Sequence, residues 1–256
     1  MIHIKSASEI EKMRRAGHIV AEVLHRMREW VAPGVTTGEL NERAEDLIRR
    51  RGGIPSFKGY PPGSRYPFPA VICTSVNEEL VHGIPGPRVL KEGDILSIDV
   101  GVIYDGYHGD AGITLPVGEI SPEAQRLLEV TEAALYAGIA QARAGNRVGD
   151  ISAAIQRTAE SAGYSVVREY TGHGIGRRMH EEPQIPNWGE PGQGPLLRPG
   201  MTLAVEAMVL AGSPQVQTLD DHWTVVSVDG KLTAYFEHTI LVRDGEPEIL
   251  TRLQNG

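Results

Sequence analysis

Two aspartates flank an otherwise apolar stretch, "SIDVGVIYDGYHGD", which spans residues 97–110. Its Asp105-Gly106 pair is typical of a two-residue hairpin turn, because both central positions of that turn need a positive φ. A hairpin centred there pairs Gly101 with Asp110, and Asp99 becomes the diagonal neighbour of Asp110 on the same face. Such neighbours lie about 7–8 Å apart between backbones. Two carboxylates this close repel each other, so the pattern predicts a divalent metal ion between them.

The same carboxylate arrangement recurs later in the chain. The segment "LKEGDILSIDV" aligns without gaps on "LRPGMTLAVEA", and this alignment sets Asp99 against Glu206. The segment "YHGDAGITLPVG" resembles "YFEHTILVRDG", which sets Asp110 against Glu237. Internal repeats of this kind indicate related structural units. Two facing repeats would bring four carboxylates to a central axis.

The segments before these strands repeat as well. Residues 32–53 and 143–164 each contain two glycines four residues apart, an acidic residue, a run with helical apolar spacing and a final glycine. The acidic residues, Glu39 and Asp150, would lie in the first helical turn, where the helix dipole favours negative charge. We therefore expect two short helices that end where the strands begin.

Longer amphipathic helices are predicted over about Ser8–Trp30 and Ser121–Ala142. No Pro/Ser-rich linker separates the two repeats, so we expect one catalytic domain over residues 1–256 rather than two domains. Within it, the repeat halves cover approximately residues 1–120 and 121–256. Helices and strands arranged in this way predict an α/β fold with a shared sheet.

The composition limits the class of protein. The chain has 256 residues, 41% hydrophobic and 23% charged, which is ordinary for a globular protein. Its net charge of -8 argues against nucleic acid as the main partner. No stretch approaches the ~20 apolar residues of a membrane span. The single cysteine, Cys73, cannot form an internal disulfide, which favours a reducing compartment and hence a cytoplasmic location.

Three histidines lie in glycine- and proline-rich contexts. His173 and His180 belong to "YTGHGIGRRMHEEP", and His82 belongs to "NEELVHGIPG". Glycines beside His173 let the backbone bend tightly and approach a ligand closely. A neutral imidazole suits first-row transition metals, whereas calcium and magnesium prefer oxygen ligands. Four carboxylates and one imidazole therefore predict a site for two such ions, which can activate a water for hydrolysis.

These segments, together with "LAVEAMV" and "YFEHTI", resemble the type I methionine aminopeptidases of the pita-bread fold over essentially the whole chain. The resemblance implies an α/β (α+β) domain with two pseudo-symmetric halves, whose curved, mainly antiparallel sheet is covered by helices. It also implies two divalent ions per chain, of Co, Mn, Fe, Zn or Ni. The residues that match the family's metal ligands are Asp99, Asp110, His173, Glu206 and Glu237.

The resemblance assigns a role to each of these residues. Asp110 and Glu237 would bridge the ions, Asp99 would bind one ion, and His173 and Glu206 would bind the other. The implied reaction is the removal of an unblocked N-terminal methionine when the next residue is small. Glu206 would move the proton from the attacking water to the leaving amine.

Two further histidines would contact the substrate in such an enzyme. By the match, His82 contacts the substrate amide nitrogen, and His180 helps stabilise the oxyanion at the scissile carbonyl. Residues that would line the methionine pocket are Tyr60, Phe68, Cys73 and Trp223. Met179 stands where bacterial members often have Phe, and the loop over residues 60–73 is longer than usual, so the pocket's shape is the least determined feature.

Other functions of the same fold are alternatives. A prolidase or aminopeptidase P usually carries a substantial N-terminal domain, for which we expect no room before the first repeat. A non-catalytic pita-bread protein that binds partners, or a metal-independent relative such as a creatinase, would have lost metal ligands. We also expect no N-terminal zinc-binding or ribosome-docking extension, and the spacing between His180 and Glu206 is too short for the insert of type II enzymes.

The resemblance also implies the partners. Nascent polypeptide N-termini and peptides would be the substrates of a monomeric enzyme, with no membrane and no direct nucleic-acid role. The basic run Arg49–Arg51 is most simply a solvated helix end favoured by the helix dipole. A transient ribosome contact is its alternative interpretation.

Overall fold

The computed structural model describes residues 2–253. Its helices are α1 (Ala7–Trp30), α2 (Thr37–Arg50), α3 (Pro122–Gln141) and α4 (Val148–Ser161). All four begin and end within two residues of the predicted spans or lie inside the predicted helical segments. No helix within residues 2–253 is long and apolar enough to cross a membrane.

The two short helices begin at similar capping arrangements. At the start of α2, the Glu39 side chain accepts a hydrogen bond from the Thr36 backbone N–H (2.7 Å) while Thr36 Oγ1 accepts one from Glu39 N. At the start of α4, Asp150 accepts from the Arg147 N–H (2.7 Å). These bonds satisfy backbone donors that a helix leaves free at its N-terminus. The predicted acidic residues therefore fix where both helices start.

Ten of the strands form one sheet, and three form a smaller one. We call the described part of the chain up to residue 120 the first region, and the part after it the second region. The strands of the first region are β1 (Ile54–Pro55), β2 (Ile72–Val76), β3 (Glu79–Val81), β4 (Ile95–Tyr104) and β5 (Tyr107–Pro116). Those of the second region are β6 (Ser165–Val166), β7 (Thr171–Gly174), β8 (Glu181–Pro186), β9 (Thr202–Leu210), β10 (Val216–Thr218), β11 (Val225–Ser227), β12 (Thr233–Leu241) and β13 (Glu248–Ile249). The large sheet runs β1-β4-β5-β12-β9-β7-β8, and all its pairs are antiparallel.

The hairpin between β4 and β5 has the predicted turn and register. Asp105 and Gly106 have φ of 49° and 79°. Tyr104 pairs with Tyr107, and Gly101 pairs with Asp110. Asp99 pairs with Gly112, two residues beyond Asp110, so both aspartates lie on one face of the sheet. The hairpin prediction is confirmed.

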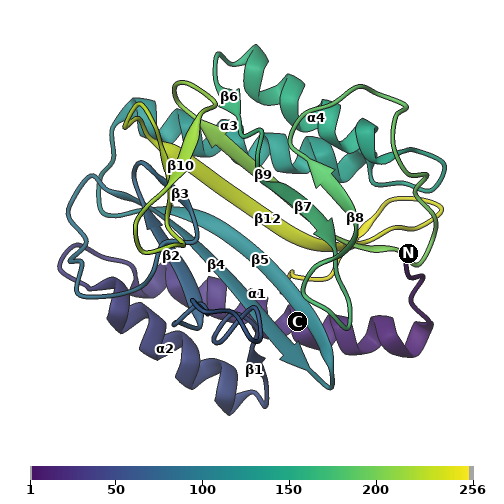
Figure 1. The fold of residues 1–256 in the computed structure, drawn as a ribbon, viewed down its shortest axis with the longest axis horizontal. Helices are drawn as coiled ribbons and strands as arrows, with labels where there is room; N and C mark the ends of the chain where they lie inside the picture. Colours follow the sequence, from purple (N-terminus) through teal and green to yellow (C-terminus); the bar gives the residue numbers. More distant parts are fainter. Residues whose placement is uncertain (1, 254–256) are drawn as a thin grey trace.

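Helices cover one face of the large sheet. α1 packs on β4 and β5, and α3 packs on β9 and β12. Figure 1 shows α1 and α3 behind the four long central strands, which curve across the molecule. The strand residues that face these helices form one large apolar cluster, which includes Ile98, Val205 and Ile240. The predicted mixed α/β fold with a curved, mainly antiparallel sheet is confirmed.

Candidate metal centre

The register of the central strands aligns the predicted carboxylates in a row. Asp99 of β4 pairs with Gly112 of β5, Gly112 pairs with Glu237 of β12, and Glu237 pairs with Glu206 of β9. Directly opposed residues have Cβ atoms about 4.5–5.5 Å apart and point to the same face. Asp110 lies two residues before Gly112 and therefore joins the same group. Strand pairing alone thus brings the four carboxylates together.

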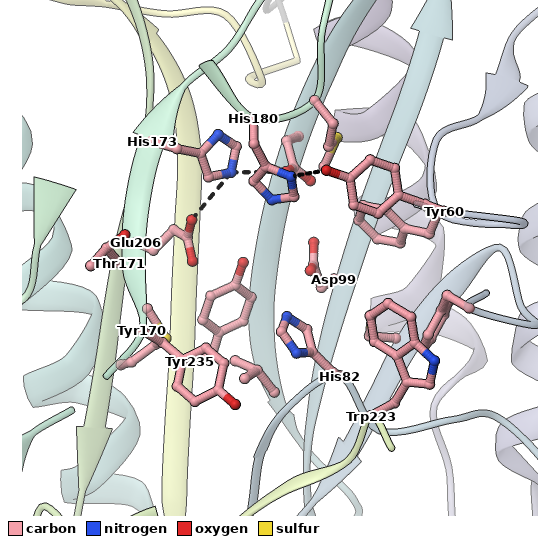
Figure 2. Close-up of a pocket in the computed structure, with 17 residues that line it drawn as sticks. Tyr60, His82, Asp99, Tyr170, Thr171, His173, His180, Glu206, Trp223 and Tyr235 are labelled. Carbon is pink, nitrogen blue, oxygen red and sulfur yellow. Dashed lines mark hydrogen bonds and ion pairs between the residues drawn. The ribbon is translucent and has the colours of Figure 1, made fainter. Parts of the chain in front are cut away.

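His173 adds a nitrogen to this group from β7. Its Nε2 lies 3.5 Å from Glu206 Oε1 and 3.9 Å from Asp110 Oδ2. Single ligand atoms of Asp110, His173 and Glu237 all lie within 4.8 Å of one another. Figure 2 shows His173, Glu206 and Asp99 pointing into one cavity from different strands. The five residues that the resemblance matched to metal ligands therefore lie around one point.

The protonation of His173 suits a metal ligand. Its Nδ1 lies 2.9 Å from the Gly174 carbonyl oxygen, which can only accept a hydrogen bond. The proton is therefore on Nδ1, and Nε2 carries the free lone pair that faces the carboxylates. Burial lowers the pKa of His173 to about 3, so the ring is neutral at physiological pH.

The four carboxylates are wholly or mostly buried, and within the described residues several of their oxygens have neither a hydrogen-bond partner nor a cationic side chain beside them. Glu237 and Asp110 are 1% and 3% exposed. Asp99 Oδ1, Asp110 Oδ1 and Glu237 Oε1 are buried without any hydrogen-bond partner. Within residues 2–253, no Lys or Arg forms an ion pair with these side chains or with Glu206. Buried charge of this kind is costly unless it is paired or coordinates a metal.

The pKa values of the four carboxylates also favour a bound cation. Burial raises the pKa of Asp99 to about 7. Burial, with the neighbouring carboxylates, raises the pKa values of Asp110, Glu206 and Glu237 well above their ordinary range. Divalent cations would stabilise the ionised forms and satisfy the free oxygens. The oxygen-rich set with one imidazole fits first-row divalent ions.

The two remaining histidines face the same cavity. The His180 ring lies against the His173 ring, with centroids 4.4 Å apart. Its Nδ1 is 2.6 Å from Tyr60 Oη, and its other ring nitrogen points into the cavity in Figure 2. His82 follows β3 with a φ of 60°, a conformation that is uncommon for residues other than glycine and often marks a functional position. Burial lowers the pKa of His82 to about 4, so it is neutral at pH 7.

An apolar pocket of about 170 Å³ lies beside the carboxylates. All four predicted pocket residues line it, and so does Met179. The rings of Phe68 and Trp223 meet edge to face at 5.2 Å. Cys73 is buried, and burial raises the pKa of its thiol well above the usual value, so its place here is that of a small apolar residue.

Sequence reasoning missed several residues of the cavity wall. These are Phe57, Val81, Tyr170, Thr171, Met208 and Tyr235. Strand alternation could have found three of them, because Thr171 precedes His173 by two residues, Tyr235 precedes Glu237 by two, and Met208 follows Glu206 by two. The others depend on how separate segments fold over the sheet.

Comparisons with known proteins identify the family. The sequence pattern of metallopeptidase family M24 matches residues 11–244. Methionine aminopeptidase 1 of Bacillus subtilis is 54% identical over 253 residues, which cover 99% of this chain and 100% of that protein. The chain belongs to the type I methionine aminopeptidases. As a methionine aminopeptidase, it is a metal-dependent hydrolase, and divalent metal cofactors are expected features of it.

The structures agree with this assignment. The crystal structure of methionine aminopeptidase from Thermotoga maritima is 47% identical and has a TM-score of 0.95, and the match covers 98% of this chain and 100% of that chain. A prolidase from Pyrococcus furiosus, the fold of one alternative, has a TM-score of 0.79 at 21% identity, and the match covers 98% of this chain and 66% of that one. The prolidase therefore shares the fold alone, and the aminopeptidase prediction holds over that alternative.

Proposed function

We propose that the chain removes an unblocked N-terminal methionine from polypeptides whose second residue is small. One observation carries this proposal: the carboxylate row and His173 Nε2 adjoin an apolar pocket large enough for one side chain. The pocket walls include Met179, Cys73 and aromatic rings, and aromatic rings make favourable contacts with thioether sulfur. A methionine side chain in this pocket would place its own peptide bond at the carboxylates.

Asp99, Asp110, His173, Glu206 and Glu237 would hold two divalent ions. When bound, such ions supply an activated water and polarise a carbonyl group. The chain's own residues would provide the rest of the chemistry. The free α-amino group of the substrate would bind one of the ions, which favours an exopeptidase.

His180 would stabilise the oxyanion as an N–H donor. Burial raises the pKa of Tyr60, so its hydroxyl stays protonated, and it would donate to His180 Nδ1, 2.6 Å away, in the tautomer that serves the reaction. The proton of the neutral imidazole then belongs on Nε2, the nitrogen that points into the cavity. A donor fixed in this way needs no reorganisation when charge develops on the carbonyl oxygen. Tyr60 therefore positions His180 in addition to lining the pocket.

Glu206 and His82 would complete the reaction. The Glu206 side chain is 12% exposed, more than the 4% of Asp110, so it is the more accessible carboxylate to a water in the cavity. It would accept the proton of the attacking water and deliver it to the leaving amine. His82 lies across the cavity, where its neutral ring can accept a hydrogen bond from the substrate amide.

The substrates would be peptides and the N-termini of nascent polypeptides, in the cytoplasm, with the enzyme acting as a monomer. The basic run at the end of α2 adds little to a ribosome contact, because each of its arginines pairs with a carboxylate of α1 or α2. The pairs are Arg49 with Glu45, Arg50 with Asp46 and Arg51 with Glu22. Any ribosome contact would therefore be transient, and no direct nucleic-acid role is proposed.

The direct test uses metal-stripped protein and the peptide Met-Ala-Ser. Mn²⁺, Co²⁺, Fe²⁺ or Zn²⁺ is added back separately, and free methionine is measured. The N-acetylated peptide and a peptide with proline in second place, Ala-Pro-Ser, are the controls. Metal-dependent release from the unblocked Met-Ala-Ser peptide alone is the expected result. No release with any metal, despite measured metal binding, would contradict the proposal, and cleavage of Ala-Pro-Ser would favour the aminopeptidase P alternative.

A further inference from the structure

Tyr235 lies on β12, two residues before Glu237, and is 3% exposed. Its backbone is fixed from β5, because Thr114 Oγ1 donates to the Tyr235 carbonyl (2.8 Å) and accepts from the Tyr235 N–H (2.9 Å). Its ring packs in a small cluster with Val81 and Met208 and lines the pocket. Both ends of the residue are therefore held in place.

The phenol of Tyr235 ends at a carboxylate of the metal centre. Its hydroxyl donates a hydrogen bond to Glu237 Oε2. Glu237 Oε1 is buried and has no hydrogen-bond partner. A carboxylate offers about four lone-pair positions, so a hydrogen bond to one oxygen leaves both oxygens able to bind a cation. The tyrosine thus restricts the rotation of a side chain whose terminal torsion is otherwise soft.

The space for this tyrosine exists because residue 112 is glycine. Gly112 lies in the carboxylate row between Asp99 and Glu237. A Cβ built on Gly112 would collide with the Tyr235 ring, with three ring carbons as its nearest neighbours. The missing side chain on β5 therefore makes room for the ring that approaches from β12. Neither residue was assigned a role by the sequence patterns of the metal ligands.

We propose that Tyr235 is a positioning residue that orients the Glu237 carboxylate for metal binding, and that Gly112 is the counterpart that admits its ring. This inference rests on the proposed metal centre. A tyrosine with a merely structural role would stabilise the fold through its ring alone, and its hydroxyl would be dispensable for metal binding. A positioning tyrosine acts through the hydroxyl, and its loss lowers metal affinity while the ring still fills the space.

The variant Tyr235→Phe separates these two roles. Partners that orient metal ligands typically change metal affinity by about 10- to 100-fold when removed. Calorimetric titration of the metal-free variant with Co²⁺ should therefore give a Kd about 10-fold or more weaker than that of the wild type. The visible absorption band of the Co²⁺-loaded protein should shift as well, because Glu237 changes its orientation.

Tyr170→Phe is the matched control. Tyr170 lines the same pocket, but its hydroxyl bonds only weakly to Thr218 Oγ1 (3.5 Å), and no bond to a carboxylate is found for it among residues 2–253. Its Co²⁺ affinity should equal that of the wild type. A far-UV circular dichroism spectrum and a thermal midpoint of each metal-free variant check that the fold is retained.

Gly112→Ala tests the same contact from β5. The added methyl group displaces the ring and should weaken Co²⁺ binding like Tyr235→Phe, and in the double variant the two losses should be less than additive. Wild-type Co²⁺ affinity in Tyr235→Phe, or in a folded Gly112→Ala, would overturn the inference while leaving the metal centre intact. A wild-type protein that binds no ion would overturn the proposed metal centre and this inference with it.

Discussion

Two strand pairs supply the carboxylates, and they differ in how their strands are joined. β4 and β5 are connected by the two-residue turn at Asp105 and Gly106, whereas β9 and β12 are connected by residues 211–232. Both pairs contribute two carboxylates to one row. The longer connection contains β10 and β11, and it also brings Trp223 to the pocket wall. The features that the two regions share therefore supply the four carboxylates, and the features that differ supply His173 and part of the pocket wall.

The similarity extends beyond the strands. Gly34 and Gly145, the first glycines of the repeated segments, both have a φ of 92°, and Gly38 and Gly149 each donate a backbone hydrogen bond to a carbonyl of a later loop, those of Gly86 and Gln193. The division into halves near residue 120 and the single catalytic domain stay predictions, which these matching features support. The repeat also explains why one row contains carboxylates from both regions.

The largest effects should come equally from both regions. Asp110→Asn and Glu237→Gln each remove a negative charge from the centre of the row while keeping the shape of the side chain. We expect each to lower the affinity for divalent ions by more than the roughly 100-fold seen for supporting residues, and to abolish peptidase activity. Calorimetry and methionine release measure the two quantities. A normal metal affinity in one variant and not in the other would show that the two strand pairs do not contribute equally to the metal centre.

An intermediate effect should come from a loop residue. His180→Ala removes the proposed oxyanion donor but no metal ligand. We expect kcat to fall by about 10²–10³-fold, as for the loss of one oxyanion donor, with unchanged metal affinity. Tyr60→Phe keeps the ring and frees His180 Nδ1, so its loss of kcat should be smaller. Weakened metal binding in His180→Ala would show that the pocket and metal centre are not separable in this way.

A smaller effect should follow from pH. Burial raises the pKa of Asp99 to about 7, and an ion needs the ionised carboxylate, so protons compete with metal below that pH. The pKa of His173, lowered to about 3 by burial, adds no competing proton in this range. From Asp99 alone, we expect the metal Kd to rise about fivefold as the pH falls from 7 to 6, because the protonated fraction of this carboxyl rises from about one half to about nine tenths. Titrations in matched buffers at both values measure it, and a pH-independent Kd would contradict the raised pKa.

The sequence predicted which candidate metal ligands lie together better than it predicted the wall of the pocket, for a physical reason. Strand alternation and a two-residue turn determine the register, so the relation between Asp99 and Asp110 followed from counting residues. The carboxylate Glu206 could be found by aligning it on Asp99. Tyr170 and Phe57 approach the cavity from segments whose paths depend on tertiary packing, and no local pattern marks them. The bond between Tyr60 and His180 joins residues 120 positions apart and was equally hidden.

The measurement that tests the account most directly is the number of ions that the metal-stripped protein binds. Calorimetry with Co²⁺, checked by elemental analysis of the loaded protein, gives this number for the wild type and for Asp99→Asn. We expect two ions per wild-type chain, and a weaker second ion in Asp99→Asn because Asp99 would serve one ion alone. A folded wild-type protein that binds no divalent ion, or one whose binding is unchanged by Asp99→Asn, would contradict a centre built by both regions.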